Sequence, residues 1–130
     1  MAEFVTFEIS KKLKEKGYPQ LKKNTLAMYN EVGEWFSLAR YLDVDEYCFD
    51  DFDEHDCVAP TISQVLKWFR DEKKLYIMPY NALSREYNIK WDFEIDDLNT
   101  SDIIYESRLI YKSYEEAAIA GIEYVINNLI

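Results

Sequence analysis

The sequence predicts a single α+β domain over residues 1–130, with three helices packed on a mainly antiparallel sheet of about five strands. Apolar residues recur every three or four positions near both ends of the chain, which is typical of helices, and alternate with polar residues in between, which is typical of strands. With 48% hydrophobic residues, a chain of this length is expected to build one core. From residue 61 onward we expect the order helix, strand, strand, strand, helix.

The first helix is expected over Glu3–Lys16, because Val5, Ile9 and Leu13 recur every four residues. Gly17 follows as a C-terminal stop. Next, two apolar runs within residues 25–38 flank a polar turn and predict a β-hairpin.

The segment 43–60 has a strongly biased charge. It contains eight carboxylates and no lysine or arginine. We expect it to be a long acidic surface loop.

A second helix is expected to begin at Thr61, where Thr61 can accept a hydrogen bond from the first turn and Gln64 can reach back. Its expected buried stripe consists of Ile62, Val65, Leu66 and Phe69. A last helix is expected after Ser113, the first residue of a second capping box that ends at Glu116. Its expected apolar face consists of Ala118, Ile119, Ile122, Val125, Ile126 and Leu129.

Three strands are expected between these helices: Leu75–Tyr80, Tyr87–Asp96 and Ile103–Lys112. Pro79 cannot donate to a ladder and places the first strand at an edge or a bulge. The second strand alternates strictly, so that Trp91 and its apolar neighbours turn toward the core.

The two later strands also predict a register. If their apolar faces point the same way, with Ile103, Tyr105, Leu109 and Tyr111 on one side of the third strand, paired residue numbers sum to 200 and Asp92 lies opposite Arg108. The element order is similar to that of double-stranded-RNA-binding domains. That family grips phosphates with lysines at the start of its second helix, where this chain has Glu115 and Glu116, so the similarity extends to topology alone.

Charge and composition exclude several classes of function. A net charge of −10 argues against direct binding to nucleic acid and to anionic membranes. No stretch approaches the roughly 18 apolar residues that span a bilayer, and the first residues lack the order of a secretory signal. We therefore expect a cytoplasmic protein with reduced cysteines.

Several short runs carry a resemblance: Ala59-Pro60-Thr61, Gln64-Val65, Trp68-Phe69-Arg70 and Ser113-Tyr114-Glu115-Glu116-Ala117. In these runs the chain resembles a family of small uncharacterised proteins from gut Bacteroides genomes and their prophages. The resemblance covers most of the chain and is strongest from residue 59 onward. It implies a bacterial or phage origin and no particular activity.

The acidic segment holds the candidate partner-binding residues, because aromatic side chains among its carboxylates can anchor a protein. These candidates are Asp50, Asp51, Phe52, Asp53, Glu54 and Asp56. The same carboxylates could imitate the charge of a nucleic-acid backbone. A calcium loop is disfavoured, because this segment has no glycine for the sharp turn.

Cys48, His55, Cys57 and Asp53 are the candidate metal ligands, although they lack the paired, short-spaced ligands of structural zinc motifs. His55 is the only histidine and no glycine-rich phosphate loop exists, so we assign no catalytic or cofactor-binding residue. Asp92 and Glu94 share a strand face at a spacing that suits acid–base work. Such pairs are ordinary on the wet side of a sheet.

These observations predict a non-enzymatic protein-interaction module that needs no cofactor. It would act on an unidentified protein or on a second copy of itself, as an accessory factor of a phage or mobile element. Aromatic residues make up 16% of the chain, more than one small core hides completely, which favours such an interface. The alternatives are a metal-binding domain or metal-dependent enzyme that uses residues 43–57, and an acidic nucleic-acid mimic.

Overall fold

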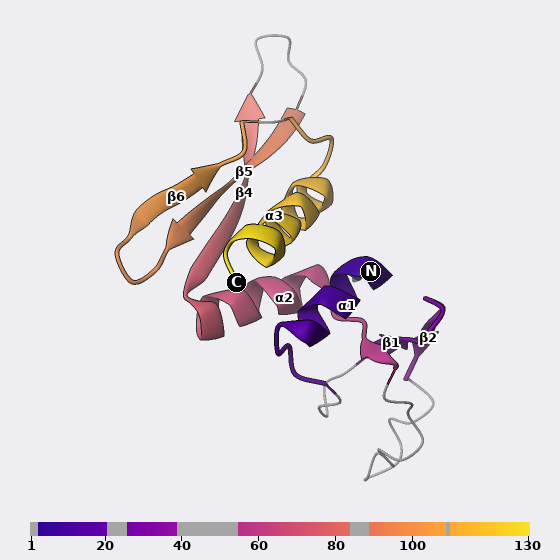
Figure 1. The fold of residues 1–130 in the computed structure, drawn as a ribbon. Helices are drawn as coiled ribbons and strands as arrows, with labels where there is room; N and C mark the ends of the chain where they lie inside the picture. Colours follow the sequence, from indigo (N-terminus) through magenta and orange to yellow (C-terminus); the bar gives the residue numbers. More distant parts are fainter. Residues whose placement is uncertain (1–2, 21–25, 39–54, 84–88, 109) are drawn as a thin grey trace. The chain divides into compact units, whose positions relative to one another are not determined.

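A computed structural model describes residues 3–20, 26–38, 55–83, 89–108 and 110–130. They form two compact units, residues 2–61 and residues 62–130, whose elements are drawn in Figure 1. The α+β class and the three α-helices are confirmed. That the whole chain is one domain stays a prediction.

In the unit of residues 2–61, helix α1 (Phe7–Glu15) begins later than expected because Thr6 caps it. The Thr6 hydroxyl accepts a hydrogen bond from the Ile9 N–H at 3.3 Å. Val5 instead lies in an extended segment, where its N–H donates to the Pro60 carbonyl at 3.0 Å. Val5, Ile9 and Leu13 are buried as predicted.

The predicted hairpin is confirmed as strands β1 (Ala27–Tyr29) and β2 (Trp35–Ser37). Asn30 orders its turn, because its side-chain oxygen accepts from the N–H groups of Val32 and Glu34. Gly33 adopts a φ of 90°, a conformation that glycine reaches without strain.

The prediction of a loop is wrong at the C-terminal end of the segment 43–60. Residues Cys57–Val58 form strand β3, which pairs antiparallel with β1, and residues 57–60 are buried. The prediction of a single sheet of about five strands is also wrong, because the described strands form two sheets. Strand β3 completes a three-stranded sheet in the order β2-β1-β3, and the remaining three strands form the other sheet. A strand of two residues is too short to show an alternating pattern, so its partner is decided by packing.

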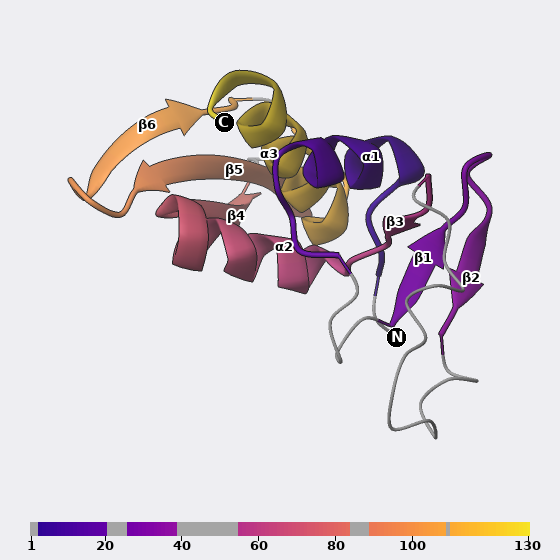
Figure 2. The ribbon, with the colours of Figure 1, turned by 60° about the horizontal axis from the view of Figure 1, so that its bottom comes forward.

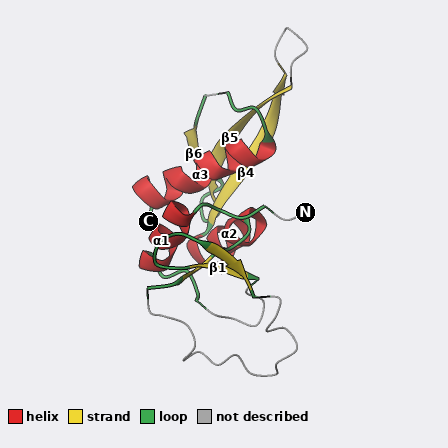
Figure 3. Ribbon diagram, turned by 90° about the vertical axis from the view of Figure 1, so that its right-hand side faces the viewer, coloured by secondary structure: helices red, strands yellow, loops and turns green. Residues whose placement is uncertain are grey.

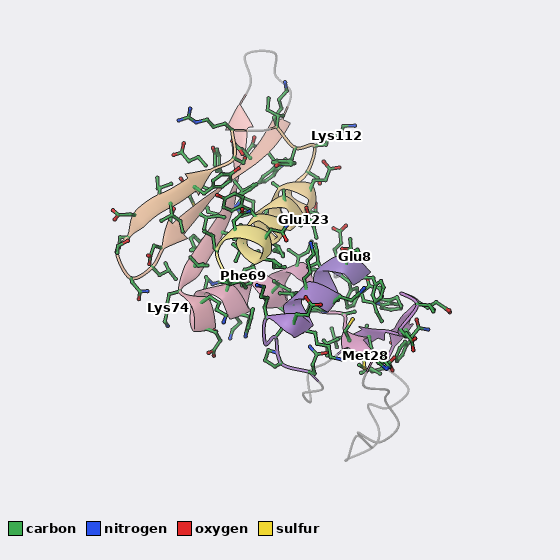
Figure 4. All side chains as sticks on the ribbon, in the orientation of Figure 1. Glu8, Met28, Phe69, Lys74, Lys112 and Glu123 are labelled. Atoms are coloured by element: carbon green, nitrogen blue, oxygen red, sulfur yellow. The ribbon has the colours of Figure 1, made fainter. Side chains whose placement is uncertain are left out.

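The unit of residues 62–130 starts with helix α2 (Ile62–Trp68), which continues as a π-helical turn, η3 (Phe69–Lys73). Lys74, labelled in Figure 4, ends it in a left-handed conformation with a φ of 56°. The predicted stripe of Ile62, Val65, Leu66 and Phe69 is buried.

The last helix, α3 (Tyr114–Asn128), is capped by Ser113 as predicted, but the Glu116 side chain reaches back to Lys112 and not to Ser113. Ser113 accepts from the Glu116 N–H at 3.1 Å, and the Glu116 carboxylate accepts from the Lys112 N–H at 3.1 Å. The buried side of α3 includes Ala118, Ile122, Val125 and Ile126, whereas Leu129 is 36% exposed.

Three antiparallel strands follow α2 in the order β4-β5-β6: β4 (Leu75–Leu83), β5 (Ile89–Asp97) and β6 (Asp102–Glu106). Figure 3 shows α3 beside the long β4–β5 hairpin. A Cβ built on Gly121 of α3 would come within 2.6 Å of Ile77 and 3.3 Å of Phe93, so α3 lies against the sheet face that these side chains form. The predicted inward orientation of Phe93 is therefore confirmed, with 2% exposure.

The predicted register is confirmed at Glu94–Glu106 and Ile95–Tyr105, whose numbers sum to 200. It fails at Arg108, which adopts a φ of 54°, so that Asp92 and Arg108 do not pair. Beyond this point, Trp91 pairs with Tyr111. An irregular stretch at residue 108 thus adds residues that strict alternation does not anticipate.

A second register shift lies between Ile95 and Asp96. Ile103 accordingly pairs with Asp96 and is 53% exposed, so its predicted place beside Tyr105 on the core side is wrong. Among the described helices, none is both long and apolar enough to cross a membrane.

Candidate functional site

The β4–β5–β6 sheet has a second face, opposite the one that α3 covers. Side chains alternate along a strand, so the neighbours of Ile77 and Phe93 point to this second face. We call it the acidic face, and its members include Tyr76, Met78, Tyr80, Lys90, Asp92, Glu94, Asp96, Ile103 and Glu106. In this unit α3 contacts β4, β5 and α2, and η3 contacts β4 and α2.

Three carboxylates form a row along β5. Asp92, Glu94 and Asp96 are two residues apart, which separates successive side chains by about 6.7 Å on one face. Each lies beside a side chain of β4 in the ladder: Tyr80, Met78 and Tyr76 respectively. Because the three residues belong to one strand, the backbone repeat of that strand sets the distance between their side chains.

A fourth carboxylate extends the row sideways. Glu106 of β6 lies directly opposite Glu94 of β5, and like charges in that position repel. The pKa of Glu94 is raised above its ordinary value, first by partial burial and then by the charges of Asp96 and Glu106. Four carboxylates against Lys90 leave the acidic face with a net negative charge.

Asp92 is the buried member of the row, with 7% exposure. The Tyr80 hydroxyl donates to its Oδ2 at 3.2 Å, and the Phe93 N–H donates to its Oδ1 at 2.7 Å. Burial, followed by the charge of Asp92 and the hydrogen bond to it, raises the pKa of Tyr80. Asp92 is thus held in place by two donors.

Asp96 differs from Asp92 in this respect. Its Oδ1 atom is buried and has no hydrogen-bond partner among the described residues. Within the same residues, Asp92, Glu94 and Asp96 form no ion pair, while Glu106 lies 3.9 Å from the Arg108 guanidinium. A buried carboxylate oxygen without a donor lowers the stability of the fold.

Of the predicted partner-binding residues, Asp50, Asp51, Phe52, Asp53 and Glu54 lie outside the described residues. Asp56 is described and half-buried, and its backbone carbonyl accepts from Lys14 Nζ at 2.7 Å. This contact joins α1 to the start of β3. The predicted role of these residues in binding a partner stays a prediction.

Of the predicted metal ligands, Cys48 and Asp53 also lie outside the described residues. His55 is exposed, whereas Cys57 is 1% exposed within β3. Burial is the main cause that raises the pKa of the Cys57 thiol, and a metal ligand must be a thiolate. In the described part of the chain, no three histidine, cysteine or acidic side chains come together as a metal site.

Asp92 and Glu94 are recognisable from the sequence as a pair without a function, whereas Asp96, Glu106 and the tyrosines are not recognisable from it as members of one surface. The alternation along β5 already placed its acidic residues on one face. What was missing is the register that brings β4 and β6 beside them. No family model, curated protein or solved structure matches the chain.

Proposed function

We propose that this chain is a non-enzymatic protein-interaction module and that the acidic face contacts a positively charged partner. The observation that carries the proposal is the row of Asp92, Glu94 and Asp96 on a regular strand, without an ion pair among the described residues. Lysine or arginine side chains of a partner would relieve the repulsion that Asp96 and Glu106 exert on Glu94.

The tyrosines support a protein as the partner. Tyr76 and Tyr80 are half-buried and flank the carboxylates on β4, and the Arg70 guanidinium lies over the Tyr76 ring at 5.8 Å. Tyrosine combined with charge is typical of protein interfaces. The resemblance described above favours an accessory role in a phage or mobile element.

A pull-down from bacterial lysate tests the proposal with two matched variants. In the face variant Glu94→Gln/Asp96→Asn/Glu106→Gln, three carboxylates of the acidic face become neutral. The control variant Asp71→Asn/Glu72→Gln/Glu123→Gln neutralises three exposed carboxylates on the helical segments; Glu123 is labelled in Figure 4. Both variants change the net charge by the same amount.

We expect one basic protein to be recovered with the wild type and with the control variant and to be lost with the face variant. Equal recovery with both variants would overturn the acidic face as the contact surface. A third variant, with the carboxylates of residues 50–56 replaced by amides, tests the acidic segment separately. Wild-type recovery with that variant would remove the segment from the interface.

A nucleic-acid mimic is the second candidate, and one observation favours it. The carboxylates of β5 repeat at about 6.7 Å along a rigid strand, as a regular series of backbone charges would. Such a mimic would bind the nucleic-acid-contacting surface of its partner. Double-stranded DNA should then displace the protein recovered in the pull-down, whereas a partner unrelated to nucleic acid would stay bound.

A further inference from the structure

The sheet of residues 62–130 has two edge strands that differ in their ability to accept another strand. Among the described strands, β4 and β6 each pair with β5 alone, and Figure 2 shows β6 at the margin of the sheet. An edge strand presents unpaired backbone N–H and C=O groups, which can pair with a segment of another protein. The two edges therefore have to be compared group by group.

Strand β4 lacks one donor on its outer edge. Even-numbered residues of β5 direct their backbone groups toward β4, as the Leu98 N–H donates to the Lys74 carbonyl just beyond the ladder. Pro79 lies opposite Phe93, an odd-numbered residue, so the nitrogen of Pro79 faces outward and carries no hydrogen. The edge position predicted for Pro79 is confirmed. The missing donor makes this edge less able to pair with another strand.

Strand β6 contains no proline, so each of its residues keeps a backbone N–H. The Ser107 N–H donates to the Phe93 carbonyl at 3.2 Å, so Ser107 faces β5. Because backbone groups alternate along an antiparallel ladder, the N–H and C=O of Glu106 point away from β5. This edge can therefore accept hydrogen bonds from a new strand.

The side chains of β6 define what kind of strand would fit. Ile103 and Ile104 are 53% and 43% exposed, although apolar residues of this size are usually buried. Glu106 stands on the acidic face beside Glu94, and Asp102 begins the strand. An added strand would place alternate side chains next to Glu106 and within reach of the β5 carboxylates.

We propose that β6 accepts an added strand from an extended partner segment that carries lysine or arginine at alternate positions and apolar residues between them. This inference rests on the proposed function and specifies its binding mode. A second copy of this chain is a poorer occupant, because β6 of that copy would bring its own Asp102 and Glu106 against like charges.

The test uses the full chain and a capped nine-residue peptide of alternating lysine and valine. The control peptide has proline in place of valine, which keeps the charge but removes alternate backbone donors. Affinity is measured by isothermal titration calorimetry, and hydrogen exchange of the Glu106 backbone amide is followed by NMR. We expect the valine peptide to bind at least about tenfold more tightly and to slow Glu106 exchange by a similar factor.

A chain variant provides independent support. Glu106→Pro removes an outward donor without breaking a bond to β5, and Glu106→Gln removes the charge alone. We expect Glu106→Pro to weaken binding of the valine peptide further than Glu106→Gln does. If Glu106→Pro fails to fold, the comparison of the two peptides and the amide exchange still decide the matter.

The remaining outcomes separate the two proposals. Equal binding of both peptides without protection of Glu106 would overturn strand addition and leave contact through the acidic face in place. Failure of the valine peptide to bind at millimolar concentration would also overturn strand addition, while the pull-down judges the proposed function by itself. If protection of the Glu106 amide from exchange rises with protein concentration in the absence of peptide, a second copy of the chain pairs with β6. That result would overturn the proposal of a basic partner segment.

Discussion

The Tyr80 hydroxyl donates a hydrogen bond of 3.2 Å to Oδ2 of Asp92, and the two residues lie directly opposite each other on β4 and β5. This bond satisfies a carboxylate that is 7% exposed. It fixes the buried end of the acidic row, from which Glu94 and Asp96 follow at regular intervals.

We expect Tyr80→Phe to lower the free energy of unfolding by about 1–3 kcal/mol, because it leaves a buried carboxylate oxygen without its donor. Urea denaturation followed by circular dichroism measures the change. Tyr114→Phe, at a tyrosine that is 38% exposed, should change stability by less than about 0.5 kcal/mol. Equal stabilities of the wild type and Tyr80→Phe would show that the hydrogen bond contributes nothing.

Glu94→Gln should stabilise the protein at pH 7 by up to about 1 kcal/mol, because it removes a charge that Glu106 opposes across the ladder. The pKa of Glu94 is raised in the folded state, so the stability present below its unfolded pKa is lost as the pH rises through the folded value. The advantage of Glu94→Gln should therefore disappear below about pH 4.3.

Urea denaturation between pH 4 and pH 7 measures this dependence. Glu72→Gln is the control, because Glu72 is an exposed residue of η3. Its effect on stability should vary less with pH. A stability difference between wild type and Glu94→Gln that grows as the pH falls would contradict the assignment.

Gly121→Ala should destabilise the protein by about 1–3 kcal/mol through overpacking, although alanine favours a helix by about 1 kcal/mol. The new Cβ would lie 2.6 Å from Cγ2 of Ile77, closer than such atoms approach. Thermal and urea unfolding measure the loss. In an Ile77→Ala background the same substitution should cost less, and an unchanged cost would locate the strain elsewhere.

Cys57 should resist alkylation in the native protein, because it is buried in β3 and its thiol has a raised pKa. Iodoacetamide labelling followed by peptide mass mapping compares native and guanidinium-unfolded protein. We expect modification of Cys57 in the unfolded sample alone. If Cys57 of the native protein is labelled rapidly, or if its labelling slows after addition of zinc, Cys57 would again be a candidate metal ligand.

The local elements of this protein are determined by its sequence. Val5, Ile9 and Leu13 are buried at the spacing that predicts the first helix, and Ser113 caps the last. The alternation around Phe93 correctly predicts a half-buried strand. These features depend on neighbours within a few residues, where backbone geometry alone sets which side chains share a face.

Tertiary structure decided what the sequence left open: that Cys57–Val58 joins the hairpin as a third strand, and that Glu106 stands beside Glu94. It also decided that Arg108 leaves the ladder and that Ile103 turns outward. Strand partners and register shifts arise from contacts between distant segments, and a shift of one residue moves side chains to the other face. The acidic face exists for that reason, because it is assembled across three strands.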